Sequence, residues 1–180
     1  MKPIFTVDAG EFLIAKEFER RGYWVWLPSK DTGIDLLVTD HTLKKSCPLQ
    51  VKFSTDFSIS DSERIGHELK LCGLFQTDLA ALKKSSARYW VLLIASFKLR
   101  KMAHLIISPR TLYERLSTIH GWQTGKRHFF VWITTDGICW ETNGLRKHEQ
   151  LAVARGEFKD ELRNLTPWMN NFEPIISELR

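Results

Sequence analysis

The sequence predicts an α/β domain in which helices flank a central mixed β-sheet, and three observations support this fold class. Amphipathic segments with helical spacing alternate with short apolar segments that are typical of strands. Residues 89–95 are continuously apolar, as expected for a strand buried on both faces. A hydrophobic fraction of 43% with seven Trp in 180 residues provides the apolar surface that a packed core needs.

The first predicted element is an amphipathic helix over residues 8–21. Its apolar residues recur at helical spacing with charged residues between them. Asp8 is a candidate N-cap and Glu11 stands three residues later, which is the spacing of a capping box. Gly22 is a stop signal, so we expect the helix to end there.

Three strands are predicted next, over residues 23–27, 34–38 and 48–53. The segments between them, residues 29–33 and 40–46, are polar turns. Because these turns are too short to hold a crossover helix, we expect the three strands to form an antiparallel meander.

The middle of the chain is predicted to begin with a polar loop over residues 54–62. A helix is expected within residues 61–84, with a possible break near Gly73. The apolar strand over residues 89–95 follows, and residues 104–107 are a further candidate strand.

The C-terminal part is predicted to hold a helix, a hairpin and two more helices. Ser followed by Pro favours a helix start, so a helix is expected over residues 108–116. An Asp-Gly pair between residues 128–134 and 138–141 predicts a β-hairpin. Residues 149–165 and 173–179 have helical character.

Nothing in the composition marks a linker, so we expect one domain over residues 1–180. Its core is expected over about residues 8–116, with the C-terminal hairpin and helices over about residues 128–180. No apolar run approaches the ~20 residues of a membrane span, and the N-terminus lacks the apolar core of a secretory signal. We therefore expect a cytoplasmic protein without a membrane partner.

Several function classes lack their usual motifs. The three cysteines, Cys47, Cys72 and Cys139, are scattered and form no CxxC pair, which argues for separate thiols in or near the core. The histidines show neither HxH nor HExxH spacing, so a zinc hydrolase is not predicted. The phosphate-binding loop of nucleoside triphosphatases is also missing from the sequence.

The net charge of +5 is concentrated in one stretch of the chain. Between Lys98 and His128 there is one acid, Glu114, against seven basic residues: Lys98, Arg100, Lys101, Arg110, Arg115, Lys126 and Arg127. The stretch fits a surface that follows a phosphate backbone, and it equally fits a solvated basic face. For the nearby aromatic residues, core packing is favoured over stacking on unpaired bases; they are Trp122, Phe129, Phe130, Trp132 and Trp140.

A candidate reactive site is predicted where two apolar strands carry polar residues. Asp35 lies in one of these strands, and Gln50 and Lys52 lie two residues apart in the next, on one face of the sheet. If the strands pair across the turn at residues 40–46, Asp35 meets both residues. From these strands alone, a cross-strand ion pair between Asp35 and Lys52 explains the pattern as well as a reactive site does.

The order of four short motifs resembles the PD-(D/E)xK nuclease superfamily, in particular its Mrr-type and Holliday-junction-resolvase-like members. The motifs cover about residues 8–55 and are Gly10-Glu11, Arg21-Gly22-Tyr23, Asp31-Thr32-Gly33-Ile34-Asp35 and Gln50-Val51-Lys52. The resemblance implies a restriction-endonuclease-like fold and a metal-dependent endonuclease that hydrolyses phosphodiester bonds, with DNA as the expected substrate. A C2 homodimer is also expected, because cutting both strands requires two sites.

The resemblance assigns a role to each residue of the candidate site. Asp35 would be the principal ligand of Mg²⁺, or of Mn²⁺ as a substitute, with help from Glu11, the Gln50 side chain and the Val51 backbone carbonyl. Such oxygen ligands suit Mg²⁺. Lys52 would orient or deprotonate the attacking water, or stabilise the developing charge. Nucleic-acid contacts are expected from Ser54, Lys98, Arg100, Lys101, Lys126 and Arg127.

The sequence departs from the family pattern at two positions, and one of them, Gln50, keeps an alternative open. Gln50 stands where many relatives have Glu, so metal binding is expected to be weaker, and an inactive module that binds nucleic acid or protein is the alternative. Ile34 precedes the motif Asp in place of Pro. Glu11 also fits a simple capping-box role, and Glu17 competes with it as the helix acid. A third possibility is an interaction domain without a nucleic-acid partner.

Overall fold

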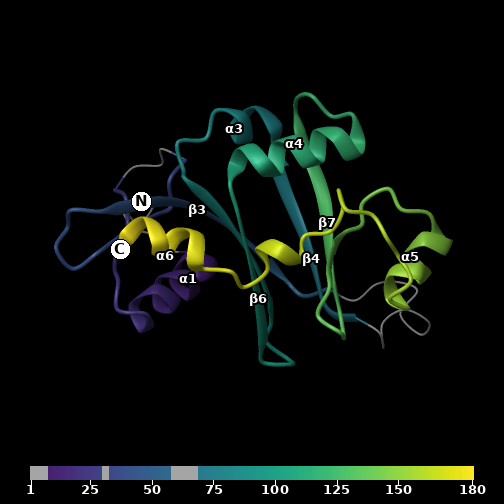
Figure 1. Ribbon diagram of the computed structural model, residues 1–180, viewed down its shortest axis with the longest axis horizontal. Coiled ribbons are helices and arrows are strands. Elements are labelled where there is room, and N and C mark those ends of the chain that lie inside the picture. Colours follow the sequence, from purple (N-terminus) through teal and green to yellow (C-terminus); the bar gives the residue numbers. More distant parts are fainter. Residues whose placement is uncertain (1–7, 30–32, 58–68) are drawn as a thin grey trace, which may run out of the picture.

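The computed structural model describes residues 8–29, 33–57 and 69–180, and over these residues the chain is an α/β protein. A five-stranded mixed sheet and a three-stranded antiparallel sheet form its centre, and helices flank them (Figure 1). The predicted fold class is therefore confirmed at the level of a mixed sheet flanked by helices.

The five-stranded sheet has the order β1-β2-β3-β5-β6. Its strands are β1 (Trp24–Trp26), β2 (Leu36–Thr39), β3 (Ser46–Thr55), β5 (Tyr89–Ser96) and β6 (Lys101–Ile107). β1 pairs antiparallel with β2, and β2 with β3, as the sequence predicted, while residues 30–32 of the predicted turn between β1 and β2 lie outside the described part. β3 and β5 pair in parallel, which makes the sheet mixed, and β5 is buried along nearly its whole length.

The three-stranded sheet contains β4 (Leu69–Asp78), β7 (Lys126–Thr134) and β8 (Cys139–Glu141). The prediction of a helix within residues 61–84 was wrong from residue 69 to residue 78, and residues 61–68 lie outside the described part. Burial alternates from Gly73 to Thr77, which is the period of a strand, and nine pairings with β7 hold this strand in place. Within the described residues 69–84 the helical segment is α3 (Leu79–Lys83).

Helices cover one face of the five-stranded sheet, and the second sheet covers much of the other. α1 (Ala9–Arg20) and α6 (Glu173–Leu179) lie side by side, and Phe18 and Ile175 share a core cluster with Val91 of β5 (Figure 1). On the opposite face, α4 (Pro109–His120) and the three-stranded sheet contribute Leu112 and Phe75 to a second cluster. α1 has the predicted capping box between Asp8 and Glu11.

The sequence predicted helix over residues 149–165, but the helix α5 (Lys147–Ala154) ends earlier. Gly156 has a φ of 74°, a left-handed backbone conformation that ends the helix. The following chain returns to the second sheet, where the Leu165 N–H donates to the carbonyl of Cys139 at 2.8 Å. A short 3₁₀ turn, η2 (Thr166–Trp168), leads on to α6. Long-range pairing with β8 therefore replaced the expected helical turns.

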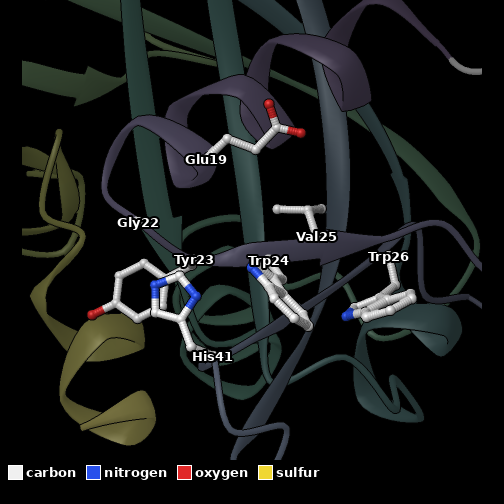
Figure 2. Close-up of a pocket in the computed structure, with 7 residues that line it drawn as sticks. All are labelled: Glu19, Gly22, Tyr23, Trp24, Val25, Trp26 and His41. Carbon is white, nitrogen blue, oxygen red and sulfur yellow. The ribbon is translucent and has the colours of Figure 1, made fainter.

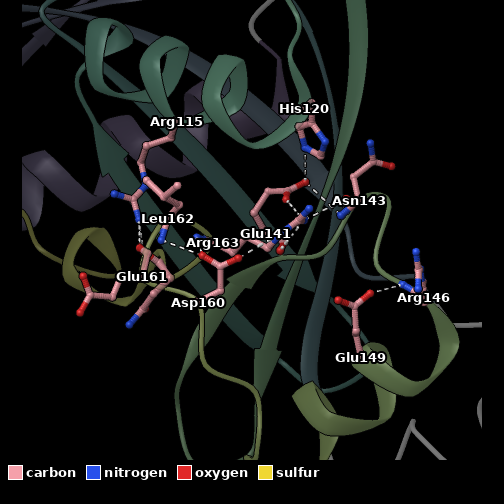
Figure 3. A network of polar contacts seen from close by, with 11 residues as sticks. Arg115, His120, Glu141, Asn143, Arg146, Glu149, Asp160, Glu161, Leu162 and Arg163 are labelled. Carbon is pink, nitrogen blue, oxygen red and sulfur yellow. Dashed lines mark hydrogen bonds and ion pairs between the residues drawn. The ribbon is translucent and has the colours of Figure 1, made fainter.

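A buried polar network fixes this returning segment to β8 and α4 (Figure 3). The Glu141 carboxylate is 1% exposed and accepts from Arg163 Nη1 at 2.5 Å and from the Asn143 N–H at 2.9 Å. His120 Nε2 lies 3.1 Å from the same carboxylate. Every partner is a residue of the fold, so we interpret this network as structural.

All three cysteines are buried, separate thiols. Burial raises the pKa of Cys47 and of Cys72 to about 12, and it raises the pKa of Cys139 as well. Among the described residues no helix has the length and apolar character needed to cross a lipid bilayer.

Candidate functional site

Asp35 is positioned by the pairing of β2 with β3. Leu36, the first residue of β2, lies opposite Leu49 of β3, and the Asp35 N–H donates to the Leu49 carbonyl at 2.8 Å. β2 was predicted to begin at residue 34 but begins at residue 36. Asp35 therefore lies directly before the first residue of β2, and its carboxylate contacts β3.

The structure brings Asp35 and Gln50 together, as the sequence predicted. Asp35 Oδ2 accepts a hydrogen bond from Gln50 Nε2 and a second one from the Val51 backbone N–H at 2.7 Å. Gln50 is 7% exposed, so this contact is largely withdrawn from water. An amide has an oxygen as well as a nitrogen at its end, and rotation by 180° would exchange the two. A carboxylate and an amide thus meet at one point.

Glu11 lies in the first turn of α1, and its Oε2 accepts from the Asp8 N–H at 3.2 Å. The pKa of its carboxyl is raised: burial is the largest cause, and the negative charge of Asp35 adds to it. The hydrogen bond from Asp8 and the positive charge of Lys52 act in the opposite direction. Glu11 is thus a capping-box acid, and the charges of Asp35 and Lys52 also influence the pKa of its carboxyl.

A close contact between α1 and β3 sets the position of Glu11. A Cβ atom on Gly10 would lie 2.7 Å from Cβ of Phe53, so only glycine fits the helix this close to the strand. The competing acid Glu17 is engaged elsewhere, because its Oε1 pairs with Arg21 at 2.8 Å.

Lys52 extends from β3 on the side of the strand that also carries Gln50. Its Nζ lies 5.5 Å from the centroid of the Trp90 ring, and Trp90 is the β5 residue opposite Gln50. An ammonium at this distance is attracted to the face of the indole. This contact holds the Lys52 charge near Gln50, and the field of that charge reaches Glu11.

The donor set at this point fits a hard cation such as Mg²⁺. It offers the carboxylates of Asp35 and Glu11, the amide of Gln50 and the carbonyl of Val51, and Mg²⁺ accepts such oxygen ligands while it keeps several waters. No cluster of three or more His, Cys, Asp or Glu suited to a metal occurs within residues 8–29, 33–57 and 69–180. A cation here would therefore depend on the neutral oxygens of Gln50 and Val51.

A pocket of 310 Å³ adjoins the site and was not predicted from the sequence. Gln50 and Trp90 form one wall, and the corner between α3 and β5 supplies Lys84, Ser85 and Ser86. A run of Lys and Ser directly before the apolar strand at residues 89–95 was the only signal in the sequence.

The predicted basic stretch is divided between two ends of the fold. Lys98, Arg100 and Lys101 lie in and beside the β5–β6 turn, whereas Gln50 lies opposite Trp90 near the start of β5. Lys126 and Arg127 begin β7 and pair with the last two residues of β4, next to α3. The five residues thus form two groups.

Other residues of the basic stretch are engaged in internal contacts. Arg110 pairs with Glu114 at 2.8 Å along α4, and Arg115 Nη2 donates to the carbonyls of Glu161 and Asn164.

Ser54, a predicted nucleic-acid contact, is buried between the two sheets. Its hydroxyl donates to the Thr55 carbonyl at 2.9 Å and accepts from the Leu74 N–H of β4 at 3.0 Å. Among the aromatic residues, the expected core packing is confirmed for Phe129, Trp132 and Trp140, which are buried.

A second, larger pocket of 460 Å³ lies at the β1 edge of the five-stranded sheet. Figure 2 shows Trp24, Trp26 and His41 on one side of β1, with Val25 directed to the other side toward Glu19. Trp24 and Trp26 are 45% and 48% exposed, which is unusual for side chains of this size. Two exposed indoles thus line the pocket at this edge of the sheet.

Comparison of the chain with protein-family models, with curated proteins and with solved structures finds no match. Asp31 and Thr32 of the candidate motif lie outside the described residues.

Proposed function

We propose that this chain is a Mg²⁺-dependent endonuclease of the PD-(D/E)xK type, with DNA as its substrate. One observation carries the proposal: Asp35 contacts both the Gln50 side chain and the Val51 backbone N–H. The order of the sequence motifs requires Asp35 to meet Gln50, and the effect of the Asp35 and Lys52 charges on the pKa of Glu11 supports the inclusion of these residues in the site.

In the proposed reaction the residues of the chain have separate tasks. Asp35, Glu11, Gln50 and the Val51 carbonyl would hold the cation, which when bound would polarise the scissile phosphate and promote ionisation of a bound water. The water oxygen forms the new bond to phosphorus as the bond to the leaving oxygen breaks, and the leaving oxygen takes up a proton. Lys52 would either orient and deprotonate the water or stabilise charge on a nonbridging oxygen.

The surroundings of Lys52 support its assignment to this reaction. The contact with the Trp90 ring restricts a flexible side chain, and the same ring lines the adjoining pocket. Restriction of this kind lowers the entropy lost when the ammonium meets a phosphate.

The test uses plasmid DNA and branched DNA with Mg²⁺ or Mn²⁺. Asp35→Asn removes the charge but leaves an oxygen that accepts from Val51, so the fold is retained while cleavage is lost. Glu19→Gln is the matched control, because Glu19 is an exposed acid that pairs with Lys16 on the surface of α1. Equal cleavage by the wild type and Asp35→Asn would exclude the assigned site.

A second candidate function is a binding module with an inactive site. The neutral Gln50 in the donor set and the exposed indoles of Trp24 and Trp26 favour it. Retention of DNA or of a protein without metal-stimulated cleavage would identify this function. The proposed homodimer is tested separately by measuring the mass in solution.

A further inference from the structure

The pocket beside Gln50 has a polar rim on one side and the candidate site on the other. Its volume of 310 Å³ is at the lower end of the range of ~300–1,000 Å³ that is usual for small-ligand sites. Lys84 and Ser86 are exposed and line it, while Gln50 and Trp90 on the opposite wall are buried. A ligand bound there would contact Gln50, whose side chain donates a hydrogen bond to Asp35.

The charge of the pocket favours an anion. Lys84 is the charged residue among the described residues that line it, and the remaining polar groups are hydroxyls and an amide. Lys52 stands at the Trp90 ring, 5.5 Å from its centroid, so a second cation is close to the same wall. The Trp90 indole N–H donates to Ser85 Oγ at 3.0 Å, which fixes both side chains.

We infer that this pocket binds a phosphate of the substrate strand next to the phosphate that is cleaved, with Lys84 and Ser86 as its contacts. The inference rests on the proposed function, because it assumes that the reacting phosphate lies at Asp35. A neighbouring phosphate held by an ammonium and a hydroxyl would align the strand along the wall formed by Gln50 and Trp90.

A structural role at the end of α3 could also explain the presence of Lys84, and the experiments must distinguish this role from phosphate binding. It caps α3 through its backbone N–H, which donates to the Ala80 carbonyl at 3.1 Å, and a cation is favourable at a helix C-terminus. Lys83 is the matched control, because it has the same charge and is the last residue of the same helix. Its Nζ lies 5.9 Å from the Tyr113 ring of α4, and it does not line the pocket.

The first experiment measures binding of duplex DNA in EDTA at several NaCl concentrations, without metal and therefore without cleavage. The slope of log Kobs against log [NaCl] is negative, and loss of one phosphate contact reduces its magnitude by about 1. We expect this loss for Lys84→Ala and a clearly smaller change for Lys83→Ala. Equal changes in the two variants, or wild-type protein that does not bind DNA, would overturn the inference.

The second experiment detects ligand binding in the pocket by NMR. Thymidine 3′,5′-bisphosphate is added to the wild type, and the indole N–H signal of Trp90, assigned with Trp90→Phe, is followed. We expect this signal to shift in the wild type and in Lys83→Ala, and to stay in place in Lys84→Ala. A Trp90 signal that does not move in the wild type, or that moves equally in Lys84→Ala, contradicts the inference.

Different results would contradict the nuclease function and the assignment of the pocket as a phosphate site. If both readouts appear but no metal stimulates cleavage, the pocket binds phosphate and the proposed nuclease function is wrong. If the wild type cleaves DNA but Lys84→Ala and Lys83→Ala behave alike, the nuclease function holds and the assignment of the pocket is wrong.

Discussion

Asp35 Oδ2 accepts the backbone N–H of Val51 at 2.7 Å, so the main chain of β3 helps to hold this carboxylate. The position of Asp35 therefore depends on the register between β2 and β3 as well as on its contact with Gln50. The Gln50 side chain can be changed while this backbone contact is kept. A substitution at Gln50 therefore tests the proposed cation site while Asp35 and its backbone contact are kept.

The first prediction concerns Gln50→Glu. Without metal, the new carboxylate faces Asp35, removes a hydrogen bond to it and lies in a buried place, so we expect a loss of about 1–3 kcal/mol of stability. A bound cation removes the repulsion, so we expect Mg²⁺ to restore the stability and half-maximal cleavage to require less Mg²⁺. Thermal unfolding with and without Mg²⁺ measures the effect.

Gln76→Glu is the control for this prediction, because Gln76 is exposed on β4. Its stability is expected to respond to Mg²⁺ as the wild type does. Destabilisation of Gln50→Glu that Mg²⁺ leaves unchanged would show that no cation binds between Asp35 and residue 50.

Local features of the sequence were sufficient to predict part of the fold and part of the candidate site. The capping box at Asp8 and the short turns around β2 depend on neighbouring residues, and from these turns the approach of Asp35 to Gln50 could be predicted. β4 depends on β7, where Gly73 lies opposite Val131, and no local pattern encodes a partner so distant in the chain. The pocket at Lys84 was missed for the same reason, since tertiary packing creates it.

The second prediction concerns Gly73, where the two sheets approach each other. A Cβ atom there would lie 2.6 Å from Cγ1 and 2.7 Å from Cδ1 of Ile94, so Gly73→Ala overpacks the core and is expected to cost about 1–3 kcal/mol. Ile94→Ala removes both atoms and costs about 2–5 kcal/mol alone. Urea unfolding of the double variant should show a loss smaller than the sum of the two. Strict additivity would mean that the two residues do not contact each other.

The third prediction concerns the buried pair of Glu141 and Arg163. Their side chains are 1% and 13% exposed, and Glu141→Gln removes the buried charged partner of the guanidinium while the more exposed Asp160, 3.6 Å from its Nε, is kept, at an expected cost of about 3 kcal/mol. Glu173→Gln is the control, because its pair with Arg180 is well exposed and should contribute at most about 1 kcal/mol. Chemical denaturation measures both. A similar small loss in the two variants would refute the structural role of the network.

The fourth prediction concerns the pH dependence of stability through His104. Burial lowers the pKa of this imidazole below its usual 6.5, while Asn170 and the charge of Glu17 act to raise it and Arg21 acts to lower it. As the pH falls below 6.5, the unfolded chain takes up the proton before the folded chain does. The stability that neutral His104 contributes is therefore complete above pH 6.5 and is lost as the pH falls through the folded pKa.

Urea unfolding between pH 7.5 and pH 5 tests this sign. We expect the wild type to lose more stability over this range than His104→Gln, whose side chain carries no titrating group. His148→Gln is the control, because His148 is exposed on α5 and its replacement should leave the wild-type pH dependence unchanged. If His104→Gln follows the wild-type curve, protonation of His104 is not what destabilises the folded chain in acid.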